Sequence, residues 1–582
     1  MTQPTTSKKT TASRQKATPK ADLPRTNEPD VSAADVLMVD PVGGWTGADL
    51  RDRLLGAGQL AVKAVRHTPR LVDAGSGLAA ELARVAVGKS NVEPARGDRR
   101  FADPTWNGHP VYRRVMQGYL AFSGTVGEVV ERSDMQWRTR ERARFAAGVF
   151  TSAVAPTNTL AGNPAAIKRA FETGGGSLRR GARNWLGDLR HNGGMPKQVD
   201  DSGFVVGENL AATPGAVVFR NDVLELIQYS PKTASVRSLP VLVIPPQINK
   251  YYFLDLAPGR SLVEHSVSRG LTTFIISWRN PTAANSHWDM DTYGKAILSA
   301  MDAMRDITGS EELVTLALCA GGITTASVLS YLAQIGDNRV KACSFAVTLM
   351  DWNIPAAIGA FNSSTLLAAA RRKGRRNGVL DARSLGTVFT WMRPNDLVWN
   401  YWVNNYLMGE KPPAFDILAW NADATNLPGA LHRQFLRIFR RNALTYDDGM
   451  TVLGHGVRLG DVKCDSYVVG GYSDHLTPWQ GCYRATQLLG GHSEFVLSPT
   501  GHIQTPVSPP GPKAHYFTGP TPGADPEEWR AAGTRHDGTW WDHWADWVTA
   551  RAGDERPAPA GLGSASHPAL CPAPGTYVHE PA

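Results

Sequence analysis

The sequence predicts an α/β fold in which a mostly parallel sheet carries helices on both faces, with a helical domain in front of it. Between about residues 241 and 349, short segments that are apolar on both faces alternate with segments of helical periodicity, as in sheets that are covered on both sides. Between about residues 112 and 189 the apolar spacing is helical. The alternating region also contains a sharp strand–turn–helix pattern at Cys319.

Composition narrows the possible functions. The chain has 582 residues, 42% of them hydrophobic, which is enough for two domains or one large decorated domain. The net charge is +8, but basic and acidic residues are interleaved, which argues against nucleic-acid binding. The five Cys include no Cys-x-x-Cys pair, and we expect neither a disulfide framework nor a metal nor a cofactor. We find no signal-peptide core and no membrane-spanning run, and we expect a soluble cytoplasmic protein.

Composition also divides the chain. Residues 1–100 begin with a basic stretch rich in Thr, Ser and Pro and continue with broken helical patterns, so we expect a disordered tail and then a loosely ordered region. Residues 101–205 are predicted to form the helical N-terminal domain, and residues 206–551 the domain that contains the sheet. Residues 552–582 are rich in Pro, Ala and Gly and are predicted to be disordered.

The predicted elements of the sheet domain follow one another in a regular order. A hairpin at 217–229 leads into the sheet. The apolar runs after it are predicted strands, and the stretches with apolar residues every three or four positions are predicted helices. The strands are 241–244, 273–277, 313–318, 344–349, 467–469 and 495–497, and the helices are 262–268, 293–307 and the segments that follow Cys319 and begin at Trp479.

An insertion interrupts this order between about residues 352 and 461. Trp391, Trp399, Trp402 and Trp420 lie in it. We predict a helical cap above the sheet, where it would exclude water. A later Trp-rich helix, which begins at Trp540, is predicted to pack in the core.

Cys319 has the surroundings of a nucleophile elbow. The run 313–318 has strand length, and apolar residues recur behind Cys319 at helical spacing. Such a turn forces the apex residue into a strained backbone conformation, so its neighbours must be small. Gly321 meets this requirement, whereas Ala317 replaces the usual glycine on the strand side. A buried Cys is more often an inert small hydrophobe, so this interpretation requires a base and an acid.

Two later loops supply a base and an acid at the carboxyl ends of predicted strands. Asp474 follows the strand 467–469, and His502 follows the strand 495–497. Cys319, Asp474 and His502 therefore occur in the nucleophile–acid–histidine order of α/β-hydrolases. We predict that they form a catalytic triad.

Other residues compete for these roles. His475 is a second candidate base, although a residue beside Asp474 cannot easily face both the acid and the nucleophile. Asp351 and Asp255 also follow predicted strands and are alternative acids, and Asp255 is more typical of a structural anchor. The cysteines at 343, 464 and 482 lack a turn and are predicted to be core residues.

An oxyanion hole would need two amide donors near the elbow. The amide of Ala320, directly after Cys319, is one candidate. The loop 245–255, which follows the strand 241–244, supplies the other. The residues themselves leave open which amide of this loop points inward.

Several segments, in one order, resemble the poly(3-hydroxyalkanoate) synthases. The resemblance extends from about Phe101 to Arg551. Length and the single long chain are similar to class I of this family, which acts without a second subunit. The matching segments are PPQINKYYFLD (245–255), SWRNP (277–281), CAGG (319–322), RPNDLVWNY (393–401), WNADATNLP (420–428), DHLTPW (474–479), GH (501–502) and, upstream, PTNTLAGNP (156–164).

This resemblance implies an α/β-hydrolase-fold acyltransferase that polymerises (R)-3-hydroxyacyl-CoA with release of CoA. The resemblance implies that Cys319 carries the growing polyester chain as a thioester, that His502 is the base and that Asp474 is the third member of the catalytic triad. The resemblance also implies Phe253 as the second oxyanion amide beside Ala320.

The resemblance further implies a homodimer joined through the cap and a location on polyester granules in the cytoplasm. The basic N-terminal tail is a candidate contact to the granule surface or to a phasin-like protein. Gln247 and Ala317 depart from the family pattern, but neither departure removes a reacting group.

Two other functions are compatible with the sequence. A thioesterase or esterase of the same fold would release free acid from hydroxyacyl-CoA without polymer. A non-catalytic, granule-associated scaffold would have a vestigial elbow, with Ala317 as its sign.

Overall fold

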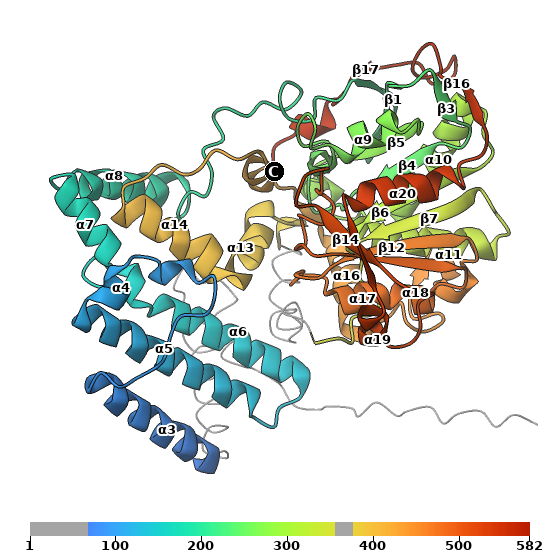
Figure 1. Cartoon of the computed structure of the whole chain (residues 1–582). Helices are drawn as coiled ribbons and strands as arrows, with labels where there is room; N and C mark the ends of the chain where they lie inside the picture. The colour runs from blue at the N-terminus through green and yellow to red at the C-terminus, as the bar shows by residue number, and fades with distance from the viewer. Residues whose placement is uncertain (1–67, 356–375) are drawn as a thin grey trace, which may run out of the picture.

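The computed structural model describes residues 68–355 and 376–582, and Figure 1 shows a group of helices beside a large sheet. The strands at the centre of the sheet pair in parallel, and those towards both edges pair antiparallel. The predicted mostly parallel sheet is confirmed. In sheet order the strands are β15 (Thr534–Asp537), β14 (His515–Thr518), β13 (Ser493–Ser498), β12 (Asp465–Gly471), β7 (Val340–Ala346), β6 (Leu313–Leu318), β4 (Val241–Ile244), β5 (Thr273–Trp278), β2 (Leu224–Tyr229), β1 (Gly215–Arg220) and β17 (Cys571–Pro572).

One strand ends earlier than predicted. The segment predicted as 344–349 is β7, which ends at Ala346. Val347 has a φ of +45°, a left-handed conformation that is incompatible with an extended strand. The next residue, Thr348, lies against the elbow helix, since a Cβ added to Gly322 would come within 2.2 Å of its Oγ1. The end of β7 therefore bends around the elbow.

Helices cover both faces of the sheet and enclose two hydrophobic cores. One core contains α10 (Met290–Thr308), α11 (Cys319–Gln334) and α16 (Gly429–Arg441). The other contains α9 (Leu262–Ser268) and α20 (Trp540–Thr549). Trp540, Trp541 and Trp544 of α20 are at most 1% exposed, so the predicted core role of this helix is confirmed. Each buried side chain of this size contributes about 1.5–3 kcal/mol.

The N-terminal part is helical, as predicted. Its apolar contacts centre on Phe101, Trp106 and Met116. Pro occupies the first turn of two of its helices, where its missing N–H costs no helical hydrogen bond. The helices are α3 (Thr68–Ala86), α4 (Thr105–Gly108), α5 (Pro110–Glu131), α6 (Trp137–Ala153), α7 (Pro164–Glu172) and α8 (Gly176–His191).

The prediction of loose order is wrong for residues 68–100. They contain α3, which packs against α5. The side-chain amide of Gln117 in α5 donates to the carbonyls of Ser90 and Val92, at 3.0 and 3.2 Å. These contacts come from a distant segment, which explains why the broken local pattern did not reveal them. The predicted basic tail lies outside the described residues.

The insertion is divided between the two parts of the molecule. Its elements up to residue 441 are β8 (Val379–Leu380), α13 (Ala382–Met392), the π-helical turns η6 (Asn395–Trp399) and η7 (Val403–Leu407) around α14 (Asn400–Trp402), α15 (Asp416–Ala422), β9 (Leu427–Pro428) and α16. Figure 1 shows α14 beside α8, away from the strands. A Cβ at Gly181 in α8 would come within 1.8 Å of the carbonyl oxygen of Tyr406. This half of the insertion packs on the helical part, whereas Trp420 in α15 packs on Phe253, with 5.1 Å between ring centroids.

The prediction of disorder for residues 552–582 is wrong. Two short strands in this segment extend the sheet region: β16 (Glu555–Pro557) pairs with β3 (Ser235–Arg237), and β17 pairs with β1. The buried carboxylate of Glu225 accepts hydrogen bonds from the amides of Thr576 and Tyr577, at 2.9 and 3.0 Å. A Pro- and Gly-rich composition indicates the absence of regular helices, but it did not exclude these long-range partners.

Candidate functional site

Cys319 occupies the sharp turn between β6 and α11. Its φ is +48°, a conformation that costs a non-glycine residue free energy and is concentrated at functional sites. A Cβ at Gly321 would come within 2.5 Å of the Pro245 carbonyl oxygen, so only glycine fits there. Ala317 is fully buried and paired with Ile244 on one side and Phe345 on the other. The methyl group that replaces the usual glycine is therefore accommodated without a break in the strand.

The structure brings the three predicted triad residues together. His502 Nδ1 lies 2.7 Å from Asp474 Oδ2, and the Cys319 side chain is near enough to His502 to help raise the pKa of the imidazole. Because Asp474 uses Nδ1, Nε2 is the ring nitrogen that remains for Cys319. Asp474 follows β12 and His502 follows β13, so all three residues lie at the carboxyl ends of parallel strands, as predicted.

Burial and charge have opposite effects on the pKa values of His502 and Asp474. Burial disfavours the imidazolium, but the Asp474 carboxylate and the hydrogen bonds to Asp474 and Cys319 outweigh it and raise the pKa of His502 to about 10. Burial also disfavours the carboxylate, but the charge and hydrogen bond of His502 and the donors on Thr477 outweigh it, and the pKa of Asp474 is lowered. The site therefore contains a strongly basic imidazole held by an ionised carboxylate.

Thr477 belongs to this network, although the sequence reading did not include it. Its hydroxyl donates to Asp474 Oδ2 at 2.6 Å and lies 3.0 Å from His502 Nδ1. Its backbone amide and that of Leu476 donate to Asp474 Oδ1, at 2.9 and 2.8 Å. The sequence carries a signal only for the turn, because an Asp side chain often accepts from backbone amides that follow it; the direction of the Thr477 hydroxyl is not encoded in that pattern.

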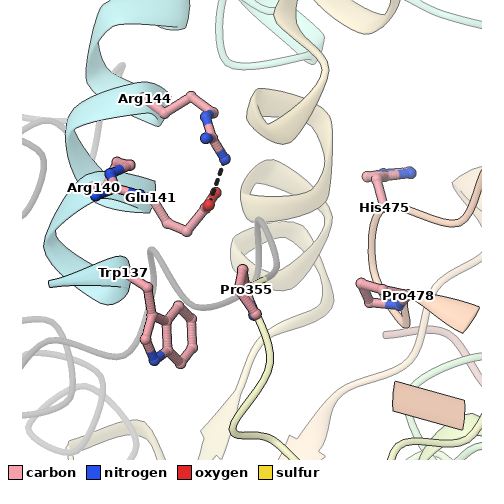
Figure 2. A pocket seen from close by; sticks show the side chains of 7 residues that line it. All are labelled: Trp137, Arg140, Glu141, Arg144, Pro355, His475 and Pro478. Carbon is pink, nitrogen blue, oxygen red and sulfur yellow. Dashed lines mark hydrogen bonds and ion pairs between the residues drawn. The ribbon is translucent and has the colours of Figure 1, made fainter. Parts of the chain in front are cut away.

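The alternative acids and base lie elsewhere. Asp255 is buried and bound to Thr213 and Ser261, which fits an anchor. Asp351 accepts a hydrogen bond from Asn442 Nδ2 at 2.8 Å. His475 lines a cavity together with Pro478 and side chains of α6 (Figure 2).

The candidate oxyanion amides lie at the start of α11 and in the loop after β4. Ala320 follows Cys319 at the N-terminus of α11, where free N–H groups point out of the helix. Phe253 lies in the 3₁₀ turn η3 (Tyr251–Leu254), and its side chain is buried against Trp420. Residues 245 and 246 are both Pro and have no N–H. The first amide after β4 therefore belongs to Gln247, whose side-chain NH₂ donates to Thr324 Oγ1 of α11 at 3.1 Å. Gln247 is thus a rival to Phe253.

Of the other cysteines, Cys343, Cys482 and Cys571 lie in β7, in the helix α17 (Trp479–Tyr483) and in β17, and Cys464 lies in the bend before β12. Cys343 and Cys482 are buried, and Cys464 and Cys571 are half-buried. Cys464 Sγ lies 3.7 Å from Cys343 Sγ. In the described part of the chain, no group of three or more His, Cys, Asp or Glu side chains has the arrangement of a metal site. None of the described helices has the length and hydropathy needed to cross a bilayer.

Comparison with known proteins shows which family this chain resembles. A family described as the N-terminus of poly-beta-hydroxybutyrate polymerase matches residues 97–266, and the alpha/beta hydrolase fold matches residues 240–508. The poly(3-hydroxyalkanoate) polymerase 1 of Ectopseudomonas oleovorans is 46% identical over 550 residues, which cover 94% of this chain and 98% of the relative. Polymerase 2 of the same organism is 43% identical over 559 residues, 96% and 99% of the two chains. The polymerase subunit of Cupriavidus necator is 39% identical over 506 residues, 85% of each chain.

Proposed function

This chain belongs to the poly(3-hydroxyalkanoate) polymerase family, and from that premise we propose that it polymerises (R)-3-hydroxyacyl-CoA through a thioester on Cys319. It is an acyltransferase-type polymerase with an α/β-hydrolase fold. The observation that supports the role of Cys319 is the elbow itself. A non-glycine residue held at a φ of +48° beside a histidine–carboxylate pair is a geometry that exposes a nucleophile.

In the proposed first step, the proton shared by Cys319 and His502 lies on the imidazole, and the thiolate sulfur attacks the thioester carbonyl of the substrate. The bond from the carbonyl carbon to the sulfur of coenzyme A breaks as the bond to Cys319 forms, and CoA leaves with a proton. One thioester replaces another, so the acyl group stays activated. The basicity of His502 favours this position of the proton. The chemistry requires no cofactor besides the CoA thioester.

In the second step, a 3-hydroxyl group attacks the acyl–Cys319 thioester and loses its proton to His502. The bond from the carbonyl carbon to the Cys319 sulfur breaks as the ester bond forms, and the thiolate of Cys319 is released. We propose that Asp474 orients His502 in both steps and does not contact the hydroxyl. Its side chain is fully buried, and its two oxygens already accept bonds from His502, Thr477 and the amide of Leu476. A carboxylate in this position fixes the tautomer of the imidazole.

The amide of Ala320 is the first proposed donor to the oxyanion. The second comes from the loop after β4, with Phe253 and Gln247 as the two candidates. Gln247→Pro would remove the backbone N–H of Gln247 and leave that of Phe253, so its effect on activity would distinguish the two candidates.

We also propose a cytoplasmic, granule-associated homodimer, with phasin-like proteins as its neighbours on the granule. Analytical ultracentrifugation with and without substrate would test the dimer.

The decisive experiment measures CoA release from (R)-3-hydroxybutyryl-CoA and analyses the product for polyester. Wild type should release CoA and form polymer, and Cys319→Ser should do neither. Cys571→Ser, at the sheet edge, is the matched control and should behave as wild type. Free acid without polymer would establish a thioesterase, and unchanged activity in Cys319→Ser would exclude the proposed nucleophile.

A further inference from the structure

A cavity of about 370 Å³ lies between the helical part and the loop that carries Asp474. Figure 2 shows the side chains of α6 on one side and those of the loop on the other, with Pro355 between them. The lining residues are Trp137, Arg140, Glu141 and Arg144 of α6, together with Pro355, His475 and Pro478. Basic and aromatic side chains thus line a cavity of ligand size beside the reaction site.

The loop wall of this cavity is formed by residues that are adjacent in the chain to the catalytic network. Asp474 and Thr477 are buried and bind His502. His475 and Pro478, each one residue further along the chain, line the cavity. A ligand in the cavity would therefore lie one residue away from the groups that orient the catalytic base.

The charges on the α6 wall are not balanced. Arg144 binds Glu131 and Glu141, which leaves it little free charge. Arg140 instead donates to the carbonyl oxygens of Ser133 and Met135, at 3.4 and 3.1 Å. Within residues 68–355 and 376–582 its Nε is buried and has no partner, and no carboxylate there is paired with it. An anion is the group that would satisfy it.

An aromatic ring lines the same cavity as Arg140. The indole of Trp137 lines the cavity, and the guanidinium of Arg138 lies 4.4 Å from its ring centroid. The remaining charged or titratable groups that face His475 are the ion pair between Arg393 and Asp396 and the triad itself. A flat ring and a guanidinium without a carboxylate partner in one cavity lining match a ligand that combines a purine with phosphate groups.

We propose that this cavity binds the nucleotide end of coenzyme A, with Trp137 stacked on the adenine and Arg140 bound to a phosphate. This inference rests on the proposed function, because that function supplies a CoA thioester as the substrate. The pantetheine arm would then extend past the loop at Asp474 towards Cys319. The helical part would thereby take a direct role in substrate binding.

Two substrates test the site. (R)-3-hydroxybutyryl-CoA carries the nucleotide, and (R)-3-hydroxybutyryl-pantetheine lacks it. We expect Arg140→Met to raise the KM for the CoA substrate about tenfold, as expected for one charge-assisted hydrogen bond, with kcat unchanged. The same variant should match wild type on the pantetheine substrate, and Trp137→Leu should behave alike. Arg113→Met, which removes an exposed charge from α5, is the matched control and should change neither value.

An equal loss on both substrates would overturn the proposal, because it would indicate a general defect of folding or of the loop at Asp474. An unchanged KM for the CoA substrate would also overturn it.

A binding measurement separates this test from the proposed function. Calorimetric titration with adenosine 3′,5′-bisphosphate requires no turnover and should give binding to wild type and to Cys319→Ser. Arg140→Met should weaken that binding about tenfold. Binding without any turnover would retain the site and contradict the proposed function, whereas turnover without binding would contradict the site alone.

Discussion

Asp474 is satisfied on both carboxylate oxygens before any substrate arrives. Two backbone amides, the Thr477 hydroxyl and the His502 ring account for its hydrogen bonds. A buried carboxylate with this many donors keeps its charge. The position of the imidazole therefore depends on neighbours that touch no substrate, and Thr477 is the one whose contribution can be removed with the smallest change of shape.

Substitution of Val for Thr477 should lower kcat about tenfold with little change in KM, because one hydrogen bond to a charged group is lost. The shape is nearly conserved, so the fold should persist. Steady-state CoA release measures both constants. Thr387→Val, which removes an exposed hydroxyl bonded to the Arg383 carbonyl, is the control. An unchanged kcat in Thr477→Val would show that Asp474 holds His502 without help.

His502 should also make stability depend on pH. Its pKa is raised from 6.5 to about 10 in the folded state, so the folded protein retains a proton that the unfolded chain releases. This contribution is fully present below about pH 6.5 and is lost as the pH rises towards 10, by about 1.4 kcal/mol per unit at most. The melting-temperature difference between wild type and His502→Gln, measured from pH 6 to 10, should shrink as the pH rises. A constant difference would contradict the raised pKa.

At the scale of elements, the elbow depends on how closely α11 approaches the end of β4. The carbonyl oxygens of Ile244 and Pro245 occupy the space that a side chain at Gly321 would need, at 2.6 and 2.5 Å. Backbone atoms cannot rotate away as a flexible side chain can. The helix must therefore carry glycine at this position if Cys319 is to keep its φ.

Gly321→Ala should reduce activity on the order of 100-fold, because a displacement of about 1 Å at the nucleophile has such an effect. It should also lower the melting temperature. Gly148→Ala in α6 is the matched control, since nothing lies within 4 Å of an added Cβ there, and Ala is the better helix former. A Gly321→Ala enzyme with wild-type activity would contradict the packing described for the elbow.

The C-terminal segment is a structural element of the sheet domain. Removal of residues 576–582 would leave Glu225, whose side chain is fully buried, with Arg220 as its remaining partner. Loss of partners from a buried charge costs roughly 3 kcal/mol, so the melting temperature should fall by several degrees. Glu225→Gln in the shortened chain should recover part of this loss, because the buried charge disappears. A melting temperature unaffected by the truncation would restore the prediction of disorder.

For the whole molecule, the insertion joins the helical part to the sheet domain. Tyr406 in η7 donates to Asp188 of α8 at 2.8 Å, and Asn184 of α8 donates to the Asn405 carbonyl at 3.0 Å. At its other end, Trp420 donates to the Lys250 carbonyl in the loop after β4, at 2.8 Å. One inserted segment therefore contacts both the N-terminal helices and the loop that supplies a candidate oxyanion amide.

Tyr406→Phe should loosen α8 and η7 together, because Asp188 loses a hydrogen bond while its buried carboxylate remains. Hydrogen exchange should become faster in residues 176–191 and 395–408 by about tenfold, and exchange in β6 and β7 should stay unchanged. Tyr446→Phe, an exposed tyrosine of the sheet domain, is the control. Faster exchange in α8 alone would contradict a shared interface.

The sequence by itself determined the parallel sheet, the elbow at Cys319 and the positions of Asp474 and His502. These depend on local patterns: runs that are apolar on both faces, small residues around a sharp turn, and polar residues at strand ends. Only the tertiary structure decided that the Thr477 hydroxyl contacts Asp474 and His502, that half of the insertion packs on α8, and that the C-terminal segment is ordered around Glu225. Each of these depends on partners that are distant along the chain or, for Thr477, on the orientation of a side chain. Such contacts form only after the backbone has folded, and neither composition nor periodicity records them.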